Sequence, residues 1–178
     1  MFTDGRSKRV VFLAHCLLNQ NAISDGTAVR PAAFREIMQV FLDADVGIVQ
    51  MPCPELCCLG LDRGDELGAE RPVVVENTRI RAEMKRPEPY ARLMTLVDYT
   101  MLQISEYHKH GFDILGIVGA NRSPNCGVDT TSAEDEEVPG KGEFMAELDR
   151  RLTDLGLHIP MVGIKGSDDL VQKMSALL

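Results

Sequence analysis

The run Arg9-Val-Val-Phe-Leu-Ala14 decides the fold, because it is short, apolar and rich in β-branched side chains. Such a run is typical of a strand that is buried on both faces of a parallel sheet. It leads directly into His15 and Cys16, so a thiol stands at the carboxyl end of the predicted strand. The same arrangement recurs twice further along the chain.

Two more apolar runs, residues 46–51 and 113–118, are predicted strands that lead into a segment containing a cysteine. Pro52-Cys53-Pro54-Glu55 follows the first run, and Cys126 closes the loop after the second. The carboxyl ends of parallel strands lie along one edge of a sheet. We therefore expect the three cysteines, which are distant in sequence, to meet at that edge.

Helical periodicity separates the predicted strands. Apolar residues recur at helical spacing over residues 32–42, after Pro31, and again over residues 90–110. A further helix over residues 142–156 ends at Gly156, a residue type favoured just beyond helix ends. Residues 158–164 are a fourth predicted strand, and a last helix is expected to begin at Ser167, an N-cap residue type.

The remaining segments are expected to be less regular. Residues 56–68 are predicted to form a long loop, residues 72–75 a short strand or extended edge, and residues 129–141 a polar, acidic loop. The alternation of strands and helices predicts a doubly wound, mostly parallel, Rossmann-like α/β sheet, with its site at the strand carboxyl ends. One domain is expected over residues 1–178.

Composition narrows the class of function. The formal net charge is −8, which repels phosphate backbones, so a nucleic acid polymer is not expected as a partner. No apolar run reaches the length of a membrane span or of a signal-peptide core, so we expect a cytoplasmic protein with no membrane partner. Thiols stay reduced in that compartment, and the five cysteines therefore indicate metal binding or catalysis before disulfides.

The cysteine pattern leaves several sites open. Cys16, Cys53 and Cys126 are the candidate metal and cofactor ligands, and soft thiolates select zinc, copper(I) or iron–sulfur clusters. A closed zinc site needs a fourth ligand, which Cys57 or Cys58 would supply. A [4Fe–4S] cluster on three thiolates leaves one iron open for chemistry. Inert buried cysteines and a catalytic thiol are the other readings.

Three short motifs carry a family resemblance. Cys16-Leu-Leu-Asn19, Pro52-Cys-Pro-Glu55 and Ser123-Pro-Asn-Cys-Gly127 resemble, in the same order, the three signatures of the 2-thiouracil desulfurase family, long known as a domain of unknown function. Asp25-Gly26 is also similar to the family pattern. So is the Gly-Lys-Gly, helix, Leu-Gly-Leu, strand order of residues 140–164. The resemblance therefore covers most of the chain.

The resemblance implies a specific chemistry. Family members hold a [4Fe–4S] cluster on three cysteines, and these correspond to Cys16, Cys53 and Cys126 here. The open iron takes the sulfur of a small thiolated pyrimidine, nucleoside or similar thioamide, and oxygen from water replaces it. By the same motifs, Glu55 is implied as general base or acid, and Ser123 as substrate donor or proton relay.

Departures from the family pattern fall near the mouth of the expected pocket and suggest a divergent branch. Ala14-His15 replaces the usual Ser-Ala, Asn19 replaces a glycine, and Leu-Cys-Cys-Leu-Gly follows the Cys-Pro-Glu motif. His15 is a candidate second acid or base, or else a satisfied structural residue. Asn19 and Asn121 are candidate substrate contacts, although asparagine is common in such loops.

Two functions of other classes compete with the desulfidase. One is a non-catalytic metal or cluster module, such as a sulfur carrier or redox sensor. The other is a metal-free cysteine hydrolase, which needs a histidine beside its thiol, and His15 adjoins Cys16. In simpler interpretations, Glu55 caps a helix N-terminus, Ser123 starts a turn, and Cys57 and Cys58 are packing or loop residues; in a functional role, one of these two cysteines would accept sulfur or provide the fourth ligand. The sequence does not predict an oligomeric state.

Overall fold

The computed structural model of the chain describes residues 2–166 and 169–178. Its central sheet has four strands, all parallel, in the order β2-β1-β3-β6. Their bounds are β1 (Arg9–Leu13), β2 (Gly47–Gln50), β3 (Asp113–Ala120) and β6 (Met161–Ile164). The order reverses between β1 and β3, the switch point at which ligands bind in doubly wound sheets. The predicted Rossmann-like α/β class and its four strands are confirmed.

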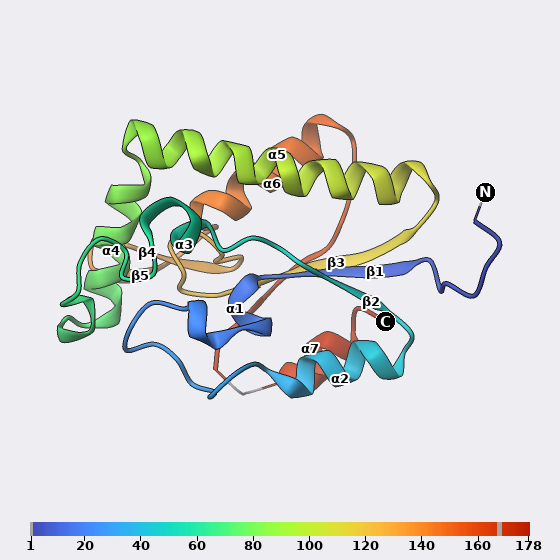
Figure 1. Ribbon diagram of the computed structural model, residues 1–178, viewed down its shortest axis with the longest axis horizontal. Helices are drawn as coiled ribbons and strands as arrows, with labels where there is room; N and C mark the ends of the chain where they lie inside the picture. Colours follow the sequence, from blue (N-terminus) through green and yellow to red (C-terminus); the bar gives the residue numbers. More distant parts are fainter. Residues whose placement is uncertain (1, 167–168) are drawn as a thin grey trace.

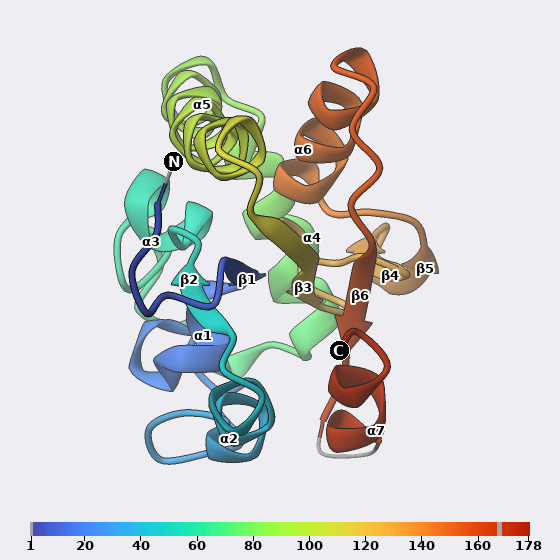
Figure 2. The same cartoon turned by 90° about the vertical axis from the view of Figure 1, so that its right-hand side faces the viewer.

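Helices cover both faces of the sheet (Figure 1). On one face lie α2 and α7, which contact each other, and on the other lie α5 and α6, with α3 against α5. Figure 2 looks along the sheet and shows these two helical layers on opposite sides of it. The bounds are α2 (Arg35–Asp43), α3 (Pro54–Leu59), α5 (Pro87–Lys109), α6 (Glu143–Asp154) and α7 (Leu170–Ser175).

Strand register places the cysteine segments at one edge. Leu13 is level with Gln50 of β2 and with Val118 of β3, so these strands reach the same edge together. β1 lies between β2 and β3, and its side chains from Val11 to Leu13 are fully buried. A strand that is buried on both faces must be apolar throughout, which is why apolar and polar residues do not alternate along β1. The chain leaves β1 through α1 (His15–Leu18) and η1 (Gln20–Ala22).

Two predictions for the segment after β2 were wrong. Residues 54–59 form α3 instead of the start of a long loop, because Pro54 occupies its first turn and the Cys53 sulfur accepts the Leu56 N–H. Residues 72–75 are not a strand, since α4 (Val73–Met84) begins there. Three successive valines favour strands, but packing of Ile80 and Met84 in the core overrides that propensity. The short helix η2 (Gly68–Glu70) precedes α4.

The acidic segment after Cys126 is not a simple loop. It contains an antiparallel hairpin of β4 (Thr130–Ala133) and β5 (Glu136–Pro139). Its turn residues, Glu134 and Asp135, both have positive φ, which matches the right-handed twist of two-residue hairpins. Helix α2 begins three residues later than predicted, and β6 is shorter. The predicted cap Ser167 lies outside the described residues.

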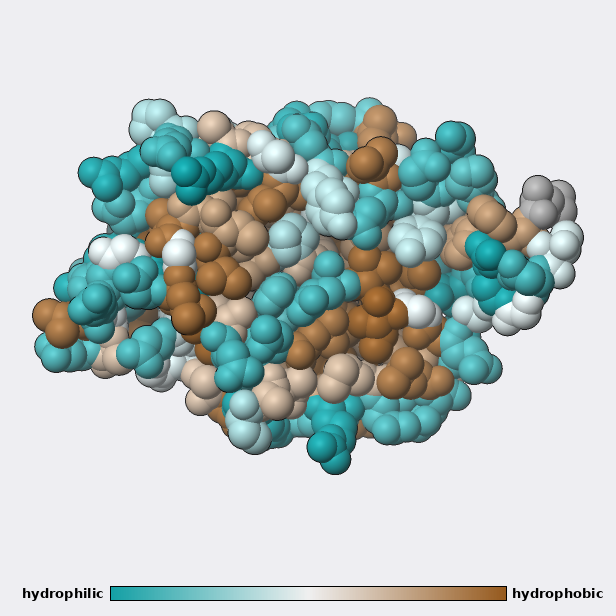
Figure 3. All heavy atoms as spheres, in the orientation of Figure 1, coloured by the Kyte–Doolittle hydropathy of each residue, from teal (hydrophilic) through white to brown (hydrophobic). Residues whose placement is uncertain are grey.

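Polar and apolar side chains are not evenly spread over the surface. On the face shown in Figure 3, apolar side chains gather in the band between α5 and α2, where the edge strand β2 lies. Among the described helices, none combines the length and apolarity that a membrane crossing requires.

Candidate functional site

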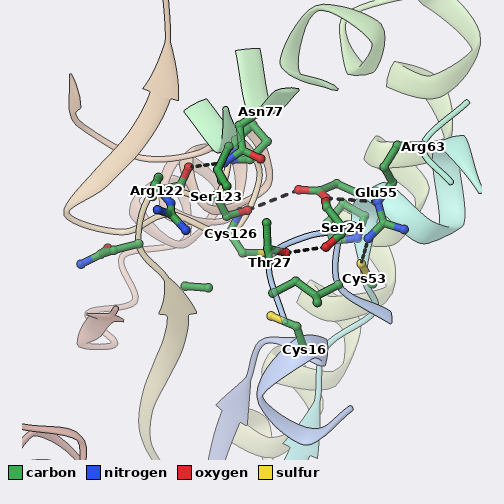
Figure 4. A pocket seen from close by; sticks show the side chains of 16 residues that line it. Cys16, Ser24, Thr27, Cys53, Glu55, Arg63, Asn77, Arg122, Ser123 and Cys126 are labelled. Atoms are coloured by element: carbon green, nitrogen blue, oxygen red, sulfur yellow. Dashed lines mark hydrogen bonds and ion pairs between the residues drawn. The ribbon is translucent and has the colours of Figure 1, made fainter. Parts of the chain in front are cut away.

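One pocket opens at the carboxyl edge of the sheet, beside the switch point between β1 and β3. The segments after β1, β2 and β3 line it, together with the start of α4. Its lining includes the three predicted ligands, Cys16, Cys53 and Cys126, and two of the three residues predicted for acid–base work, Glu55 and Ser123. Figure 4 shows them around one hollow, with Glu55 between Arg63 and Ser123. The topology thus brings together residues from three distant motifs.

Each cysteine is held by a different element. Cys16 is in the first turn of α1, Cys53 is the N-cap residue of α3, and Cys126 lies in the loop after β3. The Cys126 N–H donates to Ser123 Oγ over 2.9 Å, and its carbonyl accepts the Ala120 N–H over 2.8 Å. These bonds fold the loop back on the strand end, so the third cysteine faces the pocket from a fixed backbone.

Burial controls the protonation of these thiols. Removal from water raises the pKa of Cys16 to about 12 and that of Cys53 to about 11, and it raises the pKa of Cys126 well above its usual range. The negative charge of Glu55, and of a neighbouring cysteine when that is ionised, adds to each shift. Near neutral pH the three groups are therefore thiols, and they become good ligands when a bound cation replaces their protons.

The donor set bears on which metal group fits. Among the described residues, no three His, Cys, Asp or Glu side chains lie close enough to hold a single metal ion. Cys57 is exposed and Cys58 packs in the core, and neither lines the pocket, so no fourth thiol closes a zinc site there. Three soft thiols that approach one hollow from separate elements fit the donor set of an iron–sulfur group, which Cys16, Cys53 and Cys126 would hold.

Glu55 is buried and fully hydrogen-bonded. Its Oε2 accepts from Ser24 Oγ over 3.0 Å and from Arg63 Nε over 3.3 Å. Its Oε1 accepts from Asn125 Nδ2 over 3.2 Å and from Ser123 Oγ over 3.4 Å. Four donors, one of them cationic, suit an ionised carboxylate. A position at the N-terminus of α3 does not by itself explain the role of Glu55, because the Glu55 side chain contacts residues in the loops after β1 and β3.

Ser123 is fixed at the start of the loop that carries Cys126. Its oxygen accepts from the Asn125 and Cys126 N–H groups over 3.2 and 2.9 Å, so its own proton is free to point at Glu55. The turn role foreseen for Ser-Pro is therefore present, and it also aims the hydroxyl proton. A hydroxyl held in this way donates toward the carboxylate, and it can relay a proton from the pocket once one of its two N–H contacts is released.

Three other predicted residues have different surroundings. His15 does not line the pocket, burial lowers the pKa of its imidazole, and its Nε2 has no hydrogen-bond partner among the described residues. Asn19 also lies outside the pocket lining, and its side chain accepts the Asn21 N–H at the start of η1. Asn121 lines the pocket, but its Oδ1 binds the N–H groups of Val128 and Asp129, which makes it a brace for the loop.

Several residues that line the pocket or contact Glu55 behind it were missed by sequence reasoning. Arg63 and Ser24 contact Glu55 from loops that carry no recognised motif, and Asn125 contacts it from within the third motif. Arg122, which immediately follows Asn121, adds a second cation to the pocket lining. The available signal was weak: the glycine-rich, charged run after α3 contains Arg63, and Ser24 stands beside the Asp25-Gly26 pair.

Comparison with known proteins yields two similar chains. No family model matches the sequence. The chain is 27% identical over 123 residues to "Uncharacterized protein MJ0003" of Methanocaldococcus jannaschii. The aligned residues make up 69% of this chain and 70% of that protein. The structure is similar to the [4Fe-4S]-dependent thiouracil desulfidase TudS, with a TM-score of 0.45 and 16% identity, over 94% of this chain and 96% of the other. Neither likeness assigns an activity to this chain.

Proposed function

We propose that this protein is an iron–sulfur-dependent desulfidase that acts on a small thiolated pyrimidine, nucleoside or similar thioamide. The observation that carries the proposal is the meeting of three cysteines and one buried, hydrogen-bonded glutamate in a single pocket. The reaction replaces the C=S bond with C=O, takes its oxygen from water and releases hydrogen sulfide. It exchanges no electrons, so it needs no external reductant.

Cys16, Cys53 and Cys126 are the residues that would hold a [4Fe–4S] cluster. When bound, that group supplies a Lewis-acidic iron with a free position, which favours a soft thiocarbonyl sulfur. Cluster loading removes a proton from each thiol. The raised pKa values of the three cysteines therefore predict that loading is faster at higher pH.

Glu55 and Ser123 supply the proton chemistry. The Glu55 carboxylate is fixed by four donors, so it accepts a proton without first reorienting. Of its four contacts, the one to Ser123 Oγ is the longest, at 3.4 Å, and Ser123 lines the pocket. Ser123 Oγ already accepts two N–H groups, so it takes a proton from the attacking water only when the longer of these contacts, from Asn125 at 3.2 Å, is released, and it then passes its own proton to Glu55. The reverse path returns it to a ring nitrogen of the product.

The competing functions make less use of this geometry. A metal-free cysteine hydrolase needs a thiolate and a histidine, whereas the three pocket thiols have raised pKa values and no described histidine lines the pocket. A sulfur carrier or redox sensor needs the cysteines but gives no role to the Ser123–Glu55 contact. We also propose a cytoplasmic setting, whose reducing conditions would keep the three pocket cysteines available as ligands.

The test is turnover of thiolated pyrimidines by protein reconstituted without oxygen. Wild type, Ser123→Ala and Glu55→Gln are incubated with 2-thiouracil and 4-thiouridine, and released sulfide is measured with the loss of thiocarbonyl absorbance. We expect iron content to be retained in both variants, while kcat falls by about 100-fold, the usual size of a general acid–base contribution. Glu88→Gln, which changes an exposed glutamate at the start of α5, is the matched control.

The outcomes separate the hypotheses. Sulfide release by the wild type that is unchanged in both pocket variants contradicts the roles of Glu55 and Ser123. A fully loaded wild type that releases no sulfide from any thiolated substrate contradicts the desulfidase and favours a carrier or sensor. Sulfide release by metal-free protein contradicts the need for a cluster.

A further inference from the structure

Arg63 is the most constrained polar side chain of the pocket. It is 2% exposed, and all five of its guanidinium N–H groups have acceptors. Nε donates to Glu55 Oε2, and Nη1 donates to the carbonyls of Gly60 and Leu61 over 3.1 and 2.9 Å. Nη2 donates to the Ala22 carbonyl over 2.6 Å and contacts the Cys53 sulfur at 3.9 Å. Figure 4 shows this side chain between Glu55 and Cys53.

The backbone of Arg63 supports the same arrangement. Its φ of 56° is in the left-handed region, which is unfavourable for a residue other than glycine. Its carbonyl accepts Arg79 Nη2 over 3.0 Å, and Arg79 is in turn paired with the buried Glu76 of α4. The strained conformation is therefore held from α4, and it directs the guanidinium into the pocket.

The charge of the pocket explains why a cation is needed there. A loaded site would contain three thiolates and the Glu55 carboxylate within one partly closed hollow, and the positive charge of a [4Fe–4S] core would offset only part of this negative charge. Arg63 and Arg122 are the two cations among the described residues that line it. No described contact joins the Arg122 side chain to Cys53 or Glu55, whereas Arg63 contacts both. Because the guanidinium group is planar and rigid, Arg63 also sets the distance between Glu55 Oε2 and the Cys53 sulfur.

We propose that Arg63 is a positioning residue that couples the Cys53 ligand to Glu55 and tunes any cluster held there through an N–H···S contact. The inference rests on the proposed function and deepens it, since it concerns the same site. Hydrogen bonds to ligand sulfurs and nearby positive charge favour the reduced, more negative state of an iron–sulfur cluster. Loss of the Arg63 contact is therefore expected to lower the reduction potential.

The first experiment compares wild type, Arg63→Lys, Arg63→Gln and Arg122→Gln after anaerobic reconstitution. Iron per chain, the reduction potential of the bound cluster, and KM and kcat are measured together with thermal unfolding. We expect a lower reduction potential in both Arg63 variants, with the larger shift in Arg63→Gln. We also expect about a tenfold loss of cluster affinity, which is typical when a residue that hydrogen-bonds to a metal ligand is removed. Arg122→Gln removes an equal charge from the same lining and is expected to shift the potential less.

A purely structural role would lower thermal stability in the Arg63 variants without moving the potential, and that result overturns the proposal. An equal shift in Arg122→Gln overturns it as well, because it would show a general charge effect. The wild type separates this failure from failure of the proposed function. If the wild type takes up no cluster, the desulfidase is contradicted. If it takes one up and the Arg63 variants match it, the Arg63 inference alone fails.

A second measurement does not depend on folding of the Arg63 variants. Wild type is grown with arginine labelled with ¹⁵N in the guanidinium, its cluster is reduced by one electron, and pulsed electron paramagnetic resonance detects nitrogen coupled to the cluster. We expect a ¹⁵N coupling that persists in Arg122→Lys. Absence of the coupling in wild type, or its loss in Arg122→Lys, contradicts the assigned contact.

Discussion

Replacement of Glu55 by glutamine tests the charge balance of the pocket, because it preserves shape and removes one charge. Glu55 and Arg63 have side chains that are 9% and 2% exposed, so the pair is shielded from water. Removal of one partner of a buried pair leaves the other charge without compensation and costs about 3–5 kcal/mol. Glutamine retains an oxygen for the Arg63 Nε contact, so we expect the lower end, about 3 kcal/mol.

The assay is thermal and urea unfolding of metal-free protein at neutral pH. For a chain of this length, a loss of 3 kcal/mol corresponds to a fall in Tm of roughly 6–12 °C. Glu88→Gln breaks an ion pair whose side chains are 56% and 77% exposed, and such surface pairs contribute little, so its Tm is expected to change hardly at all. A loss below about 0.5 kcal/mol in Glu55→Gln, equal to that control, would refute the reasoning, since it would show that Arg63 needs no buried counter-charge.

Two further predictions concern the scaffold. In Gly163→Ala the added methyl group would overlap the Asn121 side chain, which braces the loop that carries Cys126. We expect the free energy of unfolding in urea to fall by about 1–3 kcal/mol, and no fall for the control Gly5→Ala, whose added methyl group would meet no neighbour. Equal stability of the two variants would contradict the bracing role of Asn121. Hydrogen bonds from Arg150 and Arg151 lower the pKa of Glu147 to about 2, so its stabilising contribution is present above pH 4.5 and is lost as the pH falls toward 2. The difference in unfolding free energy between wild type and Glu147→Gln should shrink over that window, and a constant difference would contradict the assignment.

The backbone of the site could be predicted from the sequence because each strand has a local signature. Buried parallel strands are continuous apolar runs, and their order along the chain places Cys16, Cys53 and Cys126 at one edge. The hairpin over residues 130–139 was missed because its turn, Glu134-Asp135, contains no glycine or asparagine, and glutamate is not expected at a left-handed turn position. Helix α4 was missed because tertiary packing decided against the strand propensity of its valines.

The electrostatic partners of the site could not be predicted in the same way. The contacts of Glu55 with Ser24 and Asn125 join residues 31 and 70 positions apart, and no periodicity or spacing encodes them. Arg63 lies only eight positions from Glu55, yet its role depends on a left-handed backbone conformation in an irregular loop. The positions of polar side chains on such loops follow from the fold and cannot precede it.

The most direct test of the central claim is the iron and acid-labile sulfide content of protein purified without oxygen, with ultraviolet–visible spectra, for wild type, Cys126→Ala and Cys57→Ala. Cys57 is exposed and outside the pocket lining, so its variant is the matched control. We predict about four irons per chain in wild type and in Cys57→Ala, and loss of the cluster in Cys126→Ala. Zinc, or no metal after anaerobic reconstitution of the wild type, would contradict it.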